Sequence, residues 1–301
     1  MAGAWSQRAA ESKAIAALAD HQSDRGATGR CARHTGRTGN GPAASDGTAL
    51  PGDSEATSTR SGMTTPQRLK DLAPDRITAA IAADPRLIVP VGTCDPHGPH
   101  LPLGCDTLIV DRLADDLSAE FGILRAPTVE YGVSADAARG HPRAASVRKK
   151  TLHLLLNDLL ASWEHAGVRE FILLTANGDD AHREALATVM TAAARVRVVD
   201  ACAANVTGLI AGADGWLRGG EADTSLMLYL APHLVDMRLA EQYTPDTGNR
   251  RPGPWGWPRA HRDAPRTVAP DGATAERGQS LYDHIRARIA QRIAPSPASL
   301  G

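Results

Sequence analysis

Short apolar runs and longer stretches with helical spacing alternate along the chain from about residue 63 onward. Three runs rich in branched aliphatic residues predict buried strands at 87–91, 171–174 and 196–199. Between the first two, leucines recur at spacings of three and four over residues 149–166, which predicts an amphipathic helix that ends near Gly167. Strands that alternate with helices in this way predict an α/β fold with a largely parallel sheet.

Further helices are predicted from the same spacing at 109–121, 181–194, 225–230 and 280–293. The second of these is expected to begin after Asp179 or Asp180, since a short acidic side chain is a favourable N-cap.

The N-terminal segment differs in composition from the rest of the chain. Residues 1–62 are rich in small and polar residues and carry few large apolar side chains after Leu18, so burial cannot offset the entropy of ordering them. We expect a disordered tail at 1–62, a folded domain at 63–293 and a short disordered tail at 294–301. Because Met63 opens the regular pattern, we hypothesise that it is the true start, which mass spectrometry of the native N-terminus tests.

Charge and apolar content exclude several classes of protein. The 33 Lys and Arg nearly balance the 34 Asp and Glu, so no strongly basic field favours nucleic acid as a main partner. No apolar stretch approaches the ~20 residues that cross a bilayer, and no signal peptide opens the chain, which predicts a cytoplasmic protein without a membrane partner. The four cysteines are scattered and form no CxxC pair, which favours reduced thiols.

The most informative stretch, residues 91–106, follows directly on a predicted strand and reads VGTCDPHGPHLPLGCD. Ligands gather at the carboxyl ends of strands in open α/β sheets. Asp95, His97 and Asp106 can converge there, and their oxygen and nitrogen donors suit Zn, Mn or Fe(II). The alternative is an ordinary surface turn whose polar residues make local hydrogen bonds.

This stretch resembles the signature of the creatininase (creatinine amidohydrolase) family, in which a strand ends in Gly-Ser-x-Glu-x-His-Gly-Pro-His-Leu-Pro-Leu-Gly-Thr-Asp. The resemblance spans about residues 84–292 and continues through 131–134, 149–166, 176–178, 220–225 and 272–278. It implies a three-layer α/β/α fold around a mainly parallel sheet, and a homo-oligomer that is often a hexamer. It also implies hydrolysis of a C–N bond in a cyclic or linear amide by a metal pair.

The resemblance assigns the first metal ligands position by position. The family's Glu falls on Asp95, its His on His97 and its bridging Asp on Asp106. Asp95 stands in place of the family's Glu and is shorter by one methylene. Its oxygen must therefore reach a metal from a shifted backbone or through a water. His100 belongs to the same motif and is expected to hold the loop in shape by a hydrogen bond.

Two histidines of the family are replaced in this chain. The family's Asn-Gly-His falls on residues 177–179, so Asp179 stands in place of an imidazole and favours harder cations such as Mn or Mg. His182 either supplies the missing nitrogen or is an exposed helix residue. Arg218 replaces the histidine of a segment whose Glu falls on Glu221, and it cannot accept a proton at neutral pH. Arg218 either clamps an anionic substrate, neutralises surplus carboxylates or is a solvated loop charge.

These assignments give one leading hypothesis, a hydrolase in which a metal-activated water attacks a small-molecule amide. The candidate ligands for one or two Zn, Mn or Fe ions are Asp95, His97, Asp106, Asp179 and Glu221, and the candidate catalytic residues are Glu221, Arg218 and His182. A second hypothesis is a catalytically degenerate member of the family with a binding or scaffold role. A third is an enzyme that acts on a peptide or lactam in a biosynthetic pathway.

Overall fold

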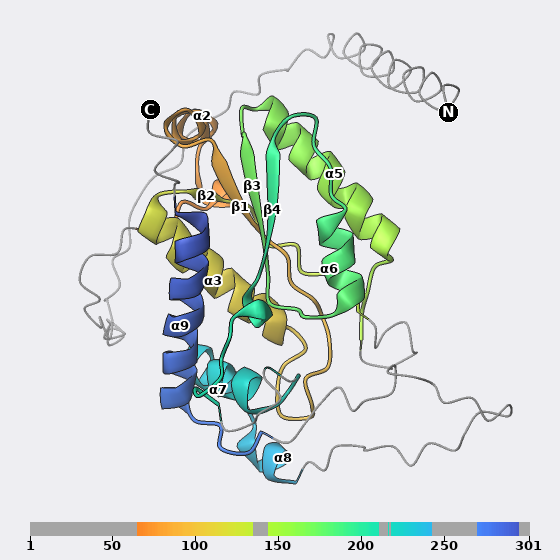
Figure 1. Ribbon diagram of the computed structural model, residues 1–301, viewed down its shortest axis with the longest axis vertical. Helices are drawn as coiled ribbons and strands as arrows, with labels where there is room; N and C mark the ends of the chain where they lie inside the picture. The colour runs from red at the N-terminus through yellow and green to blue at the C-terminus, as the bar shows by residue number, and fades with distance from the viewer. Residues whose placement is uncertain (1–64, 135–143, 211–215, 217, 243–269, 295–301) are drawn as a thin grey trace, which may run out of the picture. The chain divides into compact units, whose positions relative to one another are not determined.

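The two central strands are buried on both faces. In the computed structural model, β1 (Arg86–Pro90) and β3 (Glu170–Thr175) pair in the middle of a parallel sheet of order β2-β1-β3-β4 (Figure 1). Leu87 and Val89 join one hydrophobic core, whereas Ile88 between them joins the other. Since successive side chains of a strand point to opposite faces, helices must cover both sides of the sheet. The predicted three-layer α/β/α architecture is therefore confirmed.

The structure describes residues 65–134, 144–210, 216, 218–242 and 270–294, all within one compact unit, Thr59–Gly301. The predicted tail at 1–62 and most of the tail at 294–301 lie outside these residues. Among the described helices, none is long and apolar enough to cross a membrane.

The outer strands extend the sheet on both sides of the central pair. The edge strand β2 (Leu124–Arg125) pairs with β1, and β4 (Arg195–Asp200) pairs with β3, both in parallel. The three predicted strands correspond to β1, β3 and β4, whereas β2 is only two residues long and gives no periodic pattern. Because all strands run the same way, the segments that follow β1 and β3 emerge side by side at one edge.

One face of the sheet is covered by α3 (Cys105–Phe121), α7 (Glu221–Leu230) and α9 (Ala275–Ile293). These helices correspond to three of the predictions, and each begins several residues earlier than its apolar spacing indicates. The extra first turns carry polar residues, including Asp106 in α3 and Asp223 in α7. The start of α3 therefore lies immediately after the loop that carries the candidate ligands.

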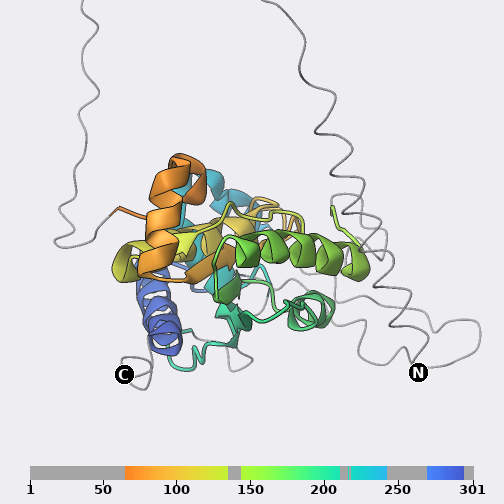
Figure 2. The same cartoon turned by 90° about the horizontal axis from the view of Figure 1, so that it is seen from above.

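The other face is covered by α2 (Pro74–Ala83), α5 (Lys149–His165) and α6 (Asp180–Ala187), with α6 beside α5 in both views (Figures 1 and 2). The predicted helix at 149–166 is confirmed as α5. Leu152, Leu156 and Leu160 are fully buried, whereas Leu155 and Leu159 are 42% and 39% exposed. The apolar stripe of α5 is thus wider than the face that packs on the sheet. The remaining helical turns are η2 (Leu69–Asp71), η3 (Ala201–Ala203), η4 (Pro232–Leu234) and α8 (Met237–Glu241).

The helix predicted at 181–194 is too long, because α6 ends at Ala187. The carboxylate of Glu164 in α5 accepts hydrogen bonds from the backbone N–H groups of residues 192–194, at 2.9, 2.6 and 2.6 Å. The side chain of Asn157, also in α5, accepts from the N–H of Met190 at 2.9 Å. These bonds satisfy backbone donors outside a helix and hold residues 188–194 as a turn before β4. The position of the helix start is confirmed, since Asp179 is the N-cap residue, but its side chain makes no capping hydrogen bond.

Close packing of α7 against α9 depends on Gly278. A Cβ atom there would lie 1.8 Å from the carbonyl oxygen of Ser225. We expect Gly278→Ala to lower the free energy of unfolding by at least about 2 kcal/mol, because a backbone atom must move to admit the methyl group. The matched control is Gly178→Ala, whose Cβ would meet only the Cβ of Cys202 at 3.7 Å and which should cost less than about 1 kcal/mol. Urea unfolding measures both values, and equal losses would contradict this account.

Candidate functional site

The loop after β1 brings three predicted site residues into one buried network. Asp95, His97 and Asp106 are at most 2% exposed. The Nε2 atom of His97 lies 2.9 Å from Oδ1 of Asp106, and its Nδ1 atom lies 2.8 Å from the backbone oxygen of Asp95. Asp106 reaches the loop because it stands in the first turn of α3. The convergence predicted from the sequence is therefore present for these residues.

Both ring nitrogens of His97 face acceptors. The carbonyl oxygen of Asp95 only accepts, and so does an ionised Asp106, which requires a proton on each nitrogen. Burial lowers the pKa of His97, but the charge and hydrogen bond of Asp106 outweigh burial, and the pKa is raised. Burial likewise raises the pKa of Asp106, yet the charge of His97 more than compensates and holds it well below the usual range. His97 and Asp106 thus form a buried ion pair.

The second carboxylate oxygen of Asp106 accepts hydrogen bonds from residues that follow β1 and β3. The hydroxyl of Thr93 donates to Oδ2 at 2.5 Å, and the side-chain amide of Asn177, which follows β3, donates to the same atom at 2.8 Å. The Asn177 amide also lies 3.0 Å from the Thr93 hydroxyl. Sequence reasoning gave Thr93 and Asn177 no role, although both lie in stretches that carry the family resemblance. Parallel pairing of β1 with β3 explains why these residues meet.

Arg218 lies among the carboxylates of this network. Its Nη1 atom donates to Oδ2 of Asp95 at 3.1 Å, and its Nη2 atom lies 3.6 Å from Oδ2 of Asp179. The side chains of Arg218 and Asp179 are each 12% exposed. Arg218 is therefore not the solvated loop charge that the sequence left open. It neutralises carboxylates, which was one of the two functional alternatives.

Asp223 is a further member of the network that sequence reasoning missed. Its Oδ2 atom lies 3.9 Å from Nε2 of His97 and accepts from the N–H of Gly219 at 2.7 Å, while Trp216 donates to its Oδ1 at 2.5 Å. Burial raises the pKa of Asp223. The sequence did carry a signal for this residue, because Asp223 falls on the second Glu of the family's His-Ala-Gly-Glu-x-Glu-Thr-Ser segment. We call Asp95, His97, Asp106, Asp179, Arg218 and Asp223 the acid cluster.

Glu221, which the sequence predicts as a metal ligand, contacts a basic side chain of the protein. It forms an ion pair with Arg277 of α9. Residues two apart on a helix are separated by about 200° around its axis, so Glu221 and Asp223 leave α7 on different sides. The structure therefore brings four of the five predicted ligands into the acid cluster and places Glu221 against α9.

His182 is fully buried, so the alternative of an exposed helix residue is wrong. The N–H of Val133 donates to its Nδ1 at 3.2 Å, which leaves the ring proton on Nε2, 3.1 Å from the Thr175 hydroxyl. Gly132 is required beside the ring, because a Cβ there would lie 2.5 Å from Cε1. His182 thus links β3 to the segment at 131–134, and both its nitrogens are engaged.

His100 is buried, and its Nε2 atom lies 2.9 Å from the Thr224 hydroxyl. It therefore ties the loop to α7, whereas the sequence predicted a bond within the loop.

The metal pair that the resemblance implies does not fit this arrangement. Carboxylates and an imidazole are suitable donors, but both ring nitrogens of His97 and both carboxylate oxygens of Asp106 are bonded to protein groups. Across the ranges that the structure describes, no three His, Cys, Asp or Glu side chains are arranged to hold a metal ion. Arg218 already supplies a positive charge beside Asp95.

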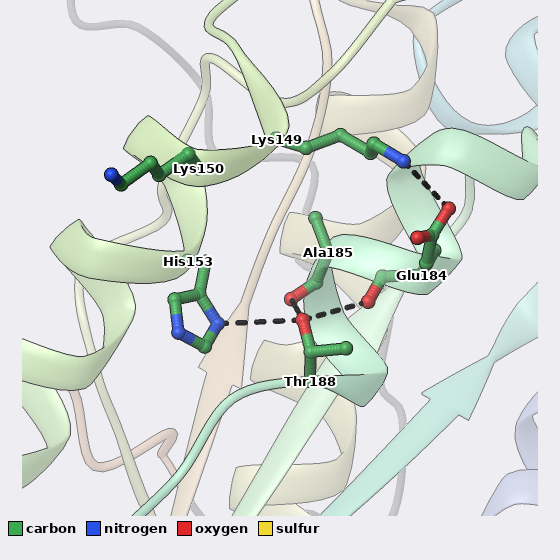
Figure 3. Close-up of a pocket in the computed structure, with 6 residues that line it drawn as sticks. All are labelled: Lys149, Lys150, His153, Glu184, Ala185 and Thr188. Atoms are coloured by element: carbon green, nitrogen blue, oxygen red, sulfur yellow. Dashed lines mark hydrogen bonds and ion pairs between the residues drawn. The ribbon is translucent and has the colours of Figure 1, made fainter. Parts of the chain in front are cut away.

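A separate pocket of about 280 Å³ lies between α5 and α6 (Figure 3). It is lined by Lys149, Lys150, His153, Glu184, Ala185 and Thr188. None of these residues belongs to the acid cluster. Lys149 and Glu184 pair across it at 2.7 Å, and both side chains are about half exposed or more. This pocket is therefore separate from the buried polar residues of the candidate site.

The buried His182 makes stability depend on pH. Burial lowers its pKa from 6.5 to about 4, so the folded chain resists a proton that the unfolded chain accepts. Its contribution to stability is present above about pH 6.5 and is lost as the pH falls toward 4. We expect His182→Gln to be less stable at pH 7.5 and to lose on the order of 3 kcal/mol less than wild type between pH 7 and 4. Chemical unfolding across that range measures this difference, and parallel curves would contradict it.

Comparison with known proteins identifies the family and the fold. The family model described as creatinine amidohydrolase matches residues 70–293. A mycofactocin precursor peptide peptidase of Mycolicibacterium smegmatis is 30% identical over 222 residues, which cover 69% of this chain and 84% of that protein. A crystal structure of creatininase superposes with a TM-score of 0.62 at 23% identity, covering 77% of this chain and 99% of the other.

Solved creatininase structures include a manganese form, with a TM-score of 0.61, and a zinc–zinc form of a mutant, with a TM-score of 0.59. At 22% and 24% identity they carry the fold, and their metals belong to those proteins. The family match extends over most of the chain and includes both strands that lead into the acid cluster. This protein is accordingly a member of the creatininase family.

Proposed function

We propose that this chain hydrolyses a C–N bond of a cyclic or linear amide at the acid cluster. The observation that carries the proposal is the buried network of Asp95, His97 and Asp106 at the carboxyl edge of the parallel sheet. Relatives support the reaction class, since the family is described as an amidohydrolase and one relative is named a peptidase of a precursor peptide. The substrate we propose is a small-molecule amide or a short peptide.

Amide hydrolysis needs a proton acceptor for water, a proton donor for the leaving nitrogen and positive charge near the developing oxyanion. Asp179 and Arg218 are the more exposed members of the acid cluster. We assign Asp179 as the acceptor and the Arg218 guanidinium as the cation that faces the carbonyl oxygen. The hydroxyl of water joins the carbonyl carbon, and its proton passes through Asp179 to the nitrogen as the C–N bond breaks.

His97 and Asp106 are more deeply buried than this pair, and they hold Asp95 and the loop in place. The metal-activated water that the resemblance implies has no assigned step, because its ligand set is not assembled among the described residues.

A second candidate function is binding without catalysis. The observation that favours it is Arg218, which stands where the family has a histidine and is paired with two aspartates. A site whose charges are satisfied internally still offers shape and polarity to a ligand, but it has less need of a reactive cofactor.

Substitution of Asp106 tests the enzyme proposal. We expect Asp106→Asn to reduce hydrolysis at least ~100-fold, because it breaks the ion pair with His97 that holds Asp95 and the loop in place. The matched control is Asp180→Asn, whose side chain is 95% exposed and should leave the rate within about twofold. Liquid chromatography with mass spectrometry follows a panel of cyclic amides and short peptides, with and without added Mn²⁺ or Zn²⁺. A wild-type chain that binds members of the panel and cleaves none supports the second candidate.

A homo-oligomer, with the hexamer as the form common in the family, and a cytoplasmic location complete the proposal. Leu154, Leu155 and Leu159 of α5 are 48%, 42% and 39% exposed, and they give a second copy of the chain an apolar face to cover. We expect light scattering after size exclusion to give a multiple of 31.7 kDa. We expect Leu155→Lys to lower the mass, whereas Leu239→Lys, at a site 41% exposed on α8, should not. A wild-type mass of one chain would contradict the oligomer.

A further inference from the structure

The acid cluster gathers four carboxylates in a small buried volume. Asp95, Asp106 and Asp223 are at most 2% exposed, and the side chain of Asp179 is 12% exposed. Carboxylates withdrawn from water remain ionised only where positive groups lie among them. His97 supplies one positive charge through its contact with Asp106. One positive charge among four carboxylates leaves a surplus of negative charge, which favours a further cation.

Arg218 supplies that charge from within the chain. Its guanidinium is bonded to Asp95 and lies beside Asp179, and the charges of Asp106 and Asp223 also act on it. Arginine remains protonated at every pH at which proteins fold, so the charge is permanent. Two of the carboxylates it faces, Asp95 and Asp179, fall on positions where the resemblance places metal ligands.

We propose that Arg218 takes the place of one ion of the metal pair implied by the family, so that this chain holds at most one divalent ion in the acid cluster. A guanidinium and a divalent cation compete for the same carboxylate oxygens, and both cannot bind Asp95 Oδ2 in the same direction. The zinc–zinc form of a creatininase has two ions, so the count distinguishes this chain from that protein. The inference holds whether or not the chain is a catalyst.

Metal counting and thermal unfolding of full-length variants test the inference without an activity assay. Purified wild type, Arg218→Ala and Arg218→Lys are stripped with a chelator, dialysed against excess Mn²⁺ or Zn²⁺, and analysed for metal per chain. We expect at most one ion in wild type and in Arg218→Lys, and one ion more in Arg218→Ala. In chelator, Arg218→Ala should melt below wild type, and added metal should raise its melting temperature by about 5 °C or more.

Arg125 offers a matched control elsewhere in the fold. It is 3% exposed and bridges Asp111 and Asp115, at 2.5 and 2.9 Å, as Arg218 bridges two aspartates of the acid cluster, and Asp115 also pairs with Arg68. Arg125→Ala should also lose stability, but metal should neither restore it nor bind in greater number than in wild type. An equal gain of metal in this variant would mean that removing an arginine from any pair of aspartates admits an ion, and it would overturn the inference.

Two ions per chain in wild type would also overturn it, as would an Arg218→Ala variant with the wild-type count and no thermal response to metal. If Arg218→Ala does not fold without metal, folding on addition of Mn²⁺ supports the inference. If that variant does not fold under either condition, the wild-type and Arg218→Lys counts decide. Loss of amide hydrolysis alone does not change these outcomes, so failure of the proposed function is recognised separately.

Discussion

The site depends on the need to keep buried carboxylates in contact with positive charge. Asp106 illustrates this need, because both its oxygens are used: one pairs with His97, and the other accepts from Thr93 and Asn177. A carboxylate in this setting would otherwise take up a proton. The loop after β1, the end of β3 and the first turn of α3 are all held by bonds to this one side chain. The contacts that balance the charge of the site are therefore also the contacts that hold the local fold.

The strands and the longest helix could be predicted from the sequence because their patterns are set by burial. Residues of β1 alternate between two cores, and the leucines of α5 face the sheet at helical spacing. The early start of α7 was not predictable from apolar spacing, since its first turn is polar and its position is fixed by contacts of Asp223 with Trp216 and Gly219. The end of α6 was mispredicted because the competing bonds come from Glu164, 28 positions before Ala192 in the sequence.

The candidate site was predictable only where residues lie close together in one motif. Asp95, His97 and Asp106 lie within twelve consecutive residues of one motif, so their convergence follows from local sequence. The choice between Glu221 and Asp223 depends on the rotation of α7 about its axis, which the pattern of residues does not give. The role of Arg218 depends on its distance from Asp95 and Asp179, which stand 123 and 39 positions away in sequence. Long-range electrostatic pairing of this kind has no periodic signature.

The bonds from Glu164 to residues 192–194 also limit how the chain can vary in length. They anchor the segment that leads into β4, whose Val196 and Val198 pack toward α5 and α6 while Val199 packs on the opposite side. An insertion or deletion of one residue between Ala194 and Val196 would exchange the two faces of the strand, so that Val196 and Val198 would leave the side of α5 and α6. Natural variants of this protein should therefore keep the spacing between residue 194 and Val196 of β4 constant, even where the residues themselves change.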